Sequence, residues 1–224
     1  MPDYVVEFGN AGEPPEPDGR LDAPAFHRNH EPIWQVLSIF LQGKTGDVLE
    51  LGSGTGQHAV EFARRAPDIV WWPTDYNENH VRSIAAWRAY AKLDNVRPPR
   101  KADLSRPDWG LPSADGEWPP SFLALLCANV IHIAPFSVAE GLFARAAHYL
   151  RPDGRLFLYG PFMRDGEHTA PSNAAFDRSL RAGNPEWGIR DIADLRKLAA
   201  RGGLALVDTV PMPSNNFILI FGRR

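Results

Sequence analysis

Three glycines, Gly52, Gly54 and Gly56, stand at alternate positions after the apolar run 48–51 and before a helix-like stretch, residues 57–63. Glycine permits a tight turn and lets a ligand approach the backbone closely. The first turn of the following helix has N–H groups without intrahelical partners, which can receive a negatively charged group. A strand, a glycine turn and a helix in this order predict a site for a nucleotide-like cofactor.

The residues beside the glycines indicate which cofactor. A dinucleotide fingerprint would need a glycine where this chain has Gln57. Glu50 lies two residues before the first glycine and suits a positively charged ammonium. S-adenosylmethionine (SAM) has such an ammonium, a carboxylate that the turn's N–H groups can bind, and no pyrophosphate. The E-x-G-x-G-x-G spacing therefore indicates a SAM site.

Polar residues at the ends of the other predicted strands fit the same cofactor. Asp75 ends the second strand, where a carboxylate can accept both ribose hydroxyls or cap the next helix. Asp103 follows the third strand, where class I SAM enzymes carry an acidic residue near the adenine amino group; a turn residue is the alternative. Leu104 would then offer its N–H to the ring. Asn129 follows the fourth strand, whose carboxyl end faces the ligand crevice of an open α/β sheet.

Two further stretches are candidates for contact with the ligands. Residues 27–31 are either a solvated helix start or a polar lid over the cofactor. Residues 161–190 form a long insertion rich in Trp, Phe, Arg, Asn and His, which is either a binding wall or a lid held by internal ion pairs. Arginines in both stretches suit an anionic acceptor. The predicted cofactor-binding residues are Arg28, Glu50, Gly52, Ser53, Gly54, Gly56, Asp75, Tyr76, Asp103, Leu104 and Asn129, and the predicted substrate-binding residues are Asn29, Arg164, Asn173, Arg181 and Trp187.

Two histidines are candidate catalytic residues. His132 lies near the end of the fourth strand and His168 lies in the insertion. If the acceptor needs to lose a proton, either imidazole can serve as a general base. A lone histidine is more often a structural residue, and that alternative stays open here.

Composition limits the other possibilities. The net charge of −3 gives no basic footprint for nucleic acid, which favours a small-molecule acceptor. The single cysteine, Cys127, excludes an internal disulfide and is expected to be a buried apolar residue. The seven histidines show no metal-ligand spacing, so we expect no metal. No apolar stretch reaches the roughly 20 residues that span a bilayer, and residues 1–20 lack the pattern of a signal peptide. A cytoplasmic protein is therefore expected, and the sequence leaves its oligomeric state open.

Strands and helices alternate along the chain, which predicts an α/β fold. Residues 1–24 are rich in proline and glycine and are expected to be loosely ordered, and residues 25–224 to form one domain. The last two strands are too close in sequence for a helical crossover, so they should be antiparallel. The expected architecture is a Rossmann-like, doubly wound, mostly parallel seven-stranded sheet with a C-terminal antiparallel hairpin. The predicted strands are 48–51, 69–73, 96–101, 122–128, 155–159, 204–210 and 217–221, and the predicted helices are 25–41, 57–65, 78–92, 137–150 and 191–201.

The chain resembles the uncharacterised methyltransferase-like 26 family, which is also classed as a numbered domain of unknown function. The matching segments cover about residues 26–222. This resemblance implies the class I methyltransferase fold and a SAM site, and it supplies no acceptor. The segments that carry it are 28–33, 49–58, 129–133, 140–143, 159–162, 172–177 and 184–191.

The sequence therefore predicts a SAM-dependent methyltransferase with an unknown, small-molecule acceptor. The first alternative is a non-catalytic module of the same fold that senses SAM or binds a partner. The second alternative is a nicotinamide-dependent oxidoreductase, which Gln57 and the closing antiparallel strands disfavour.

Overall fold

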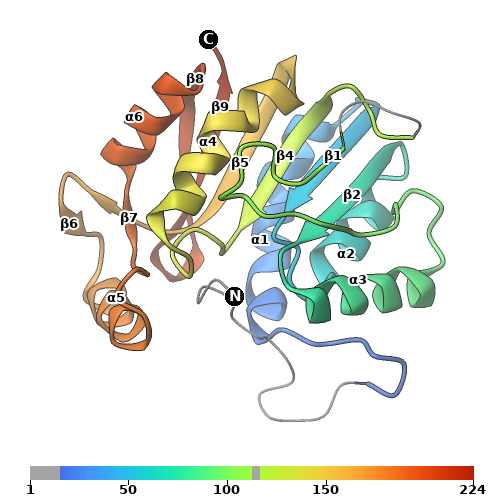
Figure 1. Ribbon diagram of the computed structural model, residues 1–224, viewed down its shortest axis with the longest axis horizontal. Helices are drawn as coiled ribbons and strands as arrows, with labels where there is room; N and C mark the ends of the chain where they lie inside the picture. The colour runs from blue at the N-terminus through green and yellow to red at the C-terminus, as the bar shows by residue number, and fades with distance from the viewer. Residues whose placement is uncertain (1–15, 113–116) are drawn as a thin grey trace.

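The computed structural model describes residues 16–112 and 117–224, so most of the segment that was expected to be loosely ordered lies outside the described residues. The described elements alternate between helices and strands, as Figure 1 shows along the colour gradient. Their bounds are α1 (Pro24–Leu41), β1 (Gly46–Leu51), α2 (Gln57–Arg65), β2 (Ile69–Asp75), α3 (Glu78–Ala91), β3 (Arg100–Lys101), β4 (Phe122–Ala128), α4 (Phe136–Tyr149), β5 (Leu150–Arg164), β6 (Glu167–His168), α5 (Pro171–Gly183), β7 (Arg190–Asp191), α6 (Ile192–Arg201), β8 (Leu204–Met212), the 3-10 turn η1 (Pro213–Asn215) and β9 (Asn216–Arg223).

The described strands confirm the predicted topology. The main sheet has the order β3-β2-β1-β4-β5-β9-β8, with the short β6 and β7 paired to the end of β5. The first five strands of that order are parallel, whereas β9 runs antiparallel to both β5 and β8. The chain therefore has the class I methyltransferase fold. The strand order reverses between β1 and β4, and ligands of doubly wound sheets bind at the carboxyl ends of the strands at such a point.

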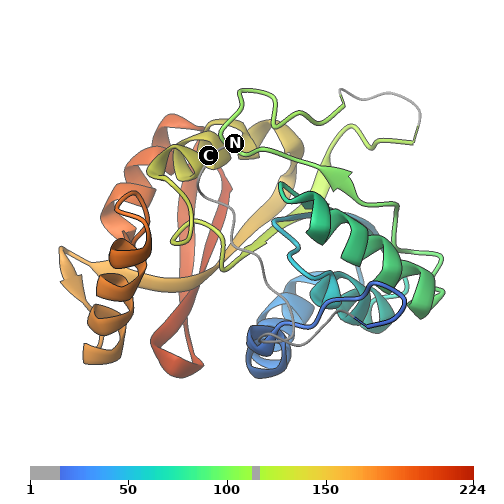
Figure 2. The same ribbon diagram turned by 60° about the horizontal axis from the view of Figure 1, so that its bottom comes forward.

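Two apolar clusters cover the two faces of the sheet. In β4, Leu125 and Cys127 belong to the cluster that includes α4 and α6, whereas Leu123 and Leu126 belong to the cluster that includes α1 and α2. All four side chains are fully buried, so Cys127 is the buried apolar residue that we expected. A strand covered on both faces explains why residues 122–128 read as a continuous apolar run. Figure 2 shows α4 and α6 on one side of the sheet and α1, α2 and α3 on the other.

The insertion differs from the irregular loop that the sequence predicted. The fifth strand continues to Arg164, and the helix α5 occupies much of the remaining insertion. The buried positions of α5 have helical spacing, but two of the three are polar: Asn173, Asp177 and Leu180. An apolar period cannot reveal such a helix, because its inward face is held mainly by hydrogen bonds.

Candidate functional site

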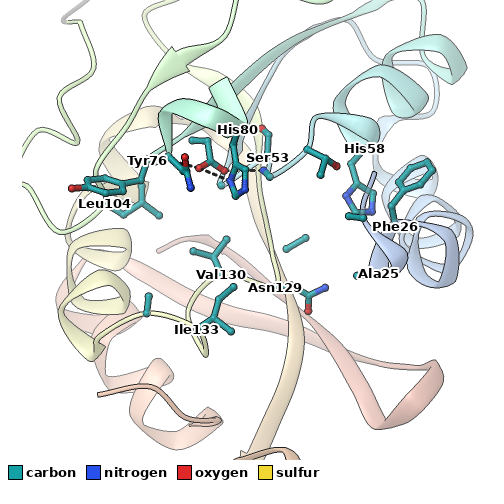
Figure 3. A pocket seen from close by; sticks show the side chains of 18 of the residues that line it. Ala25, Phe26, Ser53, His58, Tyr76, His80, Leu104, Asn129, Val130 and Ile133 are labelled. Atoms are coloured by element: carbon teal, nitrogen blue, oxygen red, sulfur yellow. Dashed lines mark hydrogen bonds and ion pairs between the residues drawn. The ribbon is translucent and has the colours of Figure 1, made fainter. Parts of the chain in front are cut away.

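A cleft opens at the carboxyl ends of β1, β2 and β4, at the point where the strand order reverses (Figure 3). Its empty volume is about 1010 Å³, its open mouth included, which is ample for a small-molecule or cofactor site. The residues that line it are Ala23, Ala25, Phe26, Asn29, Gly52, Ser53, Gly54, Thr55, His58, Asp75, Tyr76, Asn77, His80, Ala102, Leu104, Ala128, Asn129, Val130, Ile133, Ala134 and Val138. The predicted site residues among them are Asn29, Gly52, Ser53, Gly54, Asp75, Tyr76, Leu104 and Asn129.

The glycine turn has the backbone that only glycine adopts easily. Gly52, Gly54 and Gly56 all have positive φ, at 74°, 58° and 94°. A Cβ on Gly56 would lie 2.8 Å from the Ile84 Cα, so a side chain there would push α3 away from the turn. A Cβ on Gly54 would meet nothing within 4 Å, because that face of the turn opens into the cleft. The turn is therefore packed on one side and open to a ligand on the other.

Asp75 fixes the turn from the neighbouring strand. Its Oδ2 accepts a hydrogen bond from the Gly54 N–H at 2.8 Å, and its Oδ1 accepts one from the Asn77 N–H at 2.8 Å. The His80 Nδ1 lies 3.1 Å from the same Oδ1. Asn77 caps α3, since its side chain accepts from the Asn79 N–H. Asp75 thus stands at the middle of the cleft with its carboxylate held in one orientation.

The cleft has an apolar end at the third and fourth strands. Leu104 and Tyr76 lie together on one side of Figure 3, with Val130 and Ile133 facing them from the loop after β4. Asp103 does not line the cleft, and its carboxylate accepts from the N–H and the hydroxyl of Ser105, as a turn residue would. A flat apolar ring fits this end better than a charged group does.

The opposite end of the cleft is polar and is closed by residues 20–26, which we call the N-terminal strap. The strap is fastened to two helices: the Leu21 N–H donates to the Ser83 Oγ at 2.9 Å, and the Ala23 N–H donates to the Gln57 Oε1 at 2.8 Å. The Gln57 Nε2 donates to Asp22 in turn. The sequence indicated only that Gln57 stands where a dinucleotide fingerprint has its third glycine. In the structure, the Gln57 side chain holds the N-terminal strap over the cleft.

His58 and Phe26 form the wall of this polar end (Figure 3). Their rings pack edge to face with centroids 5.1 Å apart. The His58 Nε2 lies 2.8 Å from the Oδ1 of Asn29, which is 4% exposed. Burial lowers the pKa of His58 to about 3, and the charge of His30 acts in the same direction. His58 is therefore neutral at physiological pH.

Glu50 lies outside the cleft lining, although the sequence predicted that it binds the cofactor. Its side chain is 2% exposed, and its Oε2 accepts a hydrogen bond from the Trp71 Nε1 at 2.9 Å. Burial raises the pKa of Glu50 to about 8. Glu50 is on the α2 side of β1, because the side chains of a strand alternate and its neighbours Leu49 and Leu51 face α4. A role in cofactor binding therefore stays a prediction.

The loop after β4 is held by an arginine that the sequence reasoning overlooked. The buried Arg190 donates from Nε to the Ile131 O at 3.0 Å and from Nη2 to the Ala134 O at 2.5 Å and the Glu186 O at 2.9 Å. Ala134 lines the cleft, so Arg190 connects the insertion to the cleft wall after β4. Its only sequence signal is its place in the 184–191 segment that carries the resemblance.

Asn129 and His132 both lie in the loop after β4, but of the two only Asn129 lines the cleft. Asn129 lines the cleft with a left-handed backbone, φ 57°, a conformation often found at functional sites. His132 is 4% exposed, does not line the cleft and packs against Phe176 of α5. Burial lowers the pKa of His132 to about 4, with Arg190 acting in the same direction. Its role as a general base stays a prediction.

The predicted residues of the insertion and Arg28 lie away from the cleft lining. Arg181 pairs with Asp177 at 2.9 Å, an internal ion pair of the kind that a structural lid would have. Asn173 donates to the Thr169 Oγ1 and the Asn215 O, and Arg164 stacks over Phe217. The remaining placements are these: the His168 Nε2 lies 3.7 Å from Asp177, the Trp187 Nε1 is buried without a hydrogen-bond partner, and Arg28 is exposed on α1.

Residues 16–112 and 117–224 contain neither a candidate metal site nor a candidate membrane-spanning helix. No group of three or more His, Cys, Asp or Glu side chains in these residues could hold a metal ion. No helix among them has both the length and the apolar character for crossing a bilayer.

Besides Arg190, which lies behind the cleft wall, the sequence did not reveal several residues that line the cleft. His58 directly follows Gln57 in the segment 49–58, and its place one residue after the helix start was the available signal. His80 lies five residues after Asp75 and approaches it across the first turn of α3. Phe26 carried no signal beyond an apolar position in α1. These contacts depend on how α1, α2 and α3 pack together.

Comparisons with known proteins agree with this fold. A family model described as "Protein of unknown function (DUF938)" matches residues 20–223. An O-methyltransferase family protein from Burkholderia thailandensis superposes with a TM-score of 0.72 at 18% identity, over 89% of this chain and 57% of that one. The mitomycin 7-O-methyltransferase MmcR superposes with a TM-score of 0.65 at 17% identity, over 82% of this chain and 50% of that one. The calicheamicin biosynthesis methyltransferase CalO1, in its SAH-bound form, superposes with a TM-score of 0.63 at 16% identity, over 87% of this chain and 54% of that one. The chain spans about half the length of these proteins, and at such identities the likeness shows the fold.

Proposed function

Because this chain belongs to the DUF938 family of proteins of unknown function and has the class I fold, we propose that it is a SAM-dependent methyltransferase acting on a small molecule. The observation that carries the proposal is the cleft, which joins an apolar end, a central carboxylate and a polar end beside a glycine turn. The segments that resemble the methyltransferase-like 26 family support a closer relationship to that family.

The residues of the cleft fit the three parts of SAM. The apolar end at Leu104 and Val130 suits the adenine ring. Asp75 has two oxygens that together accept about four hydrogen bonds, and its described donors leave capacity for a ribose hydroxyl. The open face of Gly54 leaves room for the rest of the molecule along the turn. The residues that line the cleft come from β1–β4 or the loops after them, from α1–α4 and from the N-terminal strap.

When bound, SAM supplies a methyl group on a sulfonium that already carries the driving force for transfer. The residues of the chain are needed to align the acceptor with the donor and to exclude water. The N-terminal strap covers the polar end, and the loop held by Arg190 forms the wall on the side of β4. Asn129, the first residue after β4, donates its N–H to the Tyr159 O of β5 and lines the cleft, where it can meet the acceptor or the cofactor.

Two observations support a small molecule as the acceptor. MmcR is named as a methyltransferase of mitomycin, a small molecule. The net charge of −3 opposes binding to a polyanion such as nucleic acid.

The test is calorimetric titration with SAM, with its demethylated product S-adenosylhomocysteine (SAH) and with NADH. We expect the wild type to bind SAM and SAH, and Asp75→Ala to bind both at least about tenfold more weakly, because the turn loses its anchor and the ribose its acceptor. Asp153→Ala is the matched control, since the Asp153 side chain is 63% exposed and its described ion pair is with Arg151, outside the cleft lining. Binding of NADH alone, or of none of the three, would overturn the proposal.

Turnover separates an enzyme from a SAM-sensing module. Small-molecule extracts are incubated with methyl-labelled SAM and the wild type, with Asp75→Ala as the negative control. Label that reaches an extract compound only with the wild type supports the enzyme. Tight SAM binding without any transfer across a broad set of extracts would favour the binding module.

A further inference from the structure

The order of groups along the cleft fixes which end receives the amino-acid part of SAM, if the proposed function holds. The ribose lies between the adenine and the amino-acid part in the chemical structure of SAM. In the cleft, Leu104 marks the apolar end, and His80 stands between Leu104 and His58 in Figure 3. The His80 Nδ1 lies 3.1 Å from Asp75, so Asp75 is at the middle. The amino-acid part must then extend to the opposite end, where His58 and Phe26 form the wall (Figure 3).

The hydrogen bond to Asn29 decides which nitrogen of His58 carries the proton. The Asn29 Oδ1 can only accept, so the His58 Nε2, 2.8 Å away, must be the donor. In a neutral imidazole the other nitrogen, Nδ1, then has a lone pair and no proton. No described residue donates to Nδ1, and this nitrogen keeps some exposed surface on a side chain that lines the cleft.

Such a lone pair selects between the two charges of the amino-acid part. It can accept a hydrogen bond from an ammonium and can only repel a carboxylate. The residue that the sequence nominated for the ammonium, Glu50, has its carboxyl group bound to Trp71 and does not line the cleft. We infer that His58, through Nδ1, binds the α-ammonium of SAM and so makes the site specific for nucleosides that carry an amino-acid tail.

Asn29 is then a positioning residue for His58. It lies on α1 with 4% exposure, and its side chain is also near enough to the hydroxyl of Tyr159 on β5 to act on the pKa of that group. Its burial and the nearby Tyr159 hold the Asn29 Oδ1 toward His58, which keeps the imidazole in the tautomer that the ammonium needs. Asn29, which was predicted to bind the acceptor, acts through the cofactor in this arrangement.

The test compares two thioethers, neither of which carries the sulfonium charge of SAM, that differ in the tail. SAH has the amino-acid part, and 5′-methylthioadenosine has the same nucleoside and sulfur without it. In calorimetric titrations of the full chain, we expect His58→Phe to weaken SAH binding by about ten- to a hundredfold, the effect of losing a hydrogen bond to a charged group. Binding of 5′-methylthioadenosine should change by less than about twofold. His148→Phe, an exposed histidine of α4 outside the cleft lining, is the matched control.

A second variant keeps the test decisive if His58→Phe folds poorly. Asn29→Asp is isosteric and places a carboxylate beside the Nε2, which favours the charged imidazolium and puts a proton on Nδ1. We expect weaker SAH binding at pH 6 that recovers toward pH 9, again without an effect on 5′-methylthioadenosine. Equal weakening of both ligands, or unchanged SAH binding, would overturn the role of His58. If the wild type binds neither thioether nor SAM, the proposed function itself fails, and this inference fails with it.

Discussion

Replacement of Arg190 by methionine tests how the loop between β4 and α4 is held. The guanidinium is buried and donates to three backbone carbonyls, two of them in that loop. Methionine keeps most of the apolar stem and removes every donor, along with the guanidinium that lies over the Phe136 ring at 5.5 Å from its centroid. The change therefore removes the contacts of the guanidinium and keeps most of the packing of the stem.

The magnitude follows from the number of carbonyls that lose a charged donor. Each buried acceptor left without a partner costs about 1–3 kcal/mol, so three cost about 3–9 kcal/mol. In the wild type, the buried guanidinium is desolvated, which lowers the pKa of Arg190 and costs stability. Arg190→Met removes this cost, and its removal offsets part of the loss from the missing hydrogen bonds. We expect Arg190→Met to reduce the free energy of unfolding by about 2–4 kcal/mol, which at this chain length lowers Tm by roughly 4–16 °C.

Urea unfolding followed by tryptophan fluorescence measures this difference. Arg190→Lys should fall between the wild type and Arg190→Met, since an ammonium cannot reach all three carbonyls as a planar guanidinium does. The exposed Arg196 of α6 gives the control, and Arg196→Met should stay within about 0.5 kcal/mol of the wild type. A loss below about 1 kcal/mol for Arg190→Met would refute the view that Arg190 holds the loop.

Three further predictions concern the turn, the buried carboxyl group and the strap. Gly56→Ala should lower the free energy of unfolding by at least about 1–2 kcal/mol, because the new Cβ meets the Ile84 backbone and the residue has a positive φ. Gly183 has open space around it and no positive φ, so Gly183→Ala should change the free energy of unfolding by less than about 0.5 kcal/mol. Chemical denaturation measures both changes, and equal effects would contradict the packing argument. The pKa of Glu50 is raised from its ordinary value of 4.5 to about 8, so the folded chain binds an extra proton between these values, and stability should fall as pH rises from about 5 to 8. Glu50→Gln should lose this slope, and urea titrations at several pH values that show identical slopes for both proteins would refute the assignment. Gln57→Ala should release the N-terminal strap and speed amide exchange at residues 21–23 by about tenfold, because the strap loses its hydrogen bonds to Gln57. Hydrogen-exchange mass spectrometry measures this rate. Gln42, at the exposed end of α1, gives the control, and Gln42→Ala should leave amide exchange in the strap unchanged.

Local pattern was sufficient to predict most of the fold. The apolar run 122–128 is a strand because it is buried on both faces, and the glycine turn follows β1 because no other residue adopts three positive φ values so easily. Asp75 could be placed at the ligand crevice from its position at the end of β2 alone. These features depend on residues that are adjacent in sequence or on the general geometry of parallel sheets.

Features that depend on packing between distant segments could not be read from the sequence. The spacing around Glu50 is the same whether its side chain faces the ligand or the Trp71 indole, and only the stacking of α2 on the sheet decides between them. The helix α5 presents mainly polar groups inward, so its apolar pattern is weak. The use of His58 needs Asn29, which is 29 residues earlier in the chain.

The bonds from Arg190 also determine where this protein can be divided for engineering. Its guanidinium donates to the Glu186 O within the insertion and to the Ile131 O and Ala134 O in the loop between β4 and α4. The two segments therefore share one buried anchor. A chimera that exchanges the insertion together with residues 186–190 would remove that anchor and loosen the wall of a cleft that lies outside the exchanged sequence. A graft that ends before residue 186 leaves the anchor intact. The safe boundary for redesigning the insertion is therefore set by a side chain's hydrogen bonds and not by the ends of the secondary-structure elements.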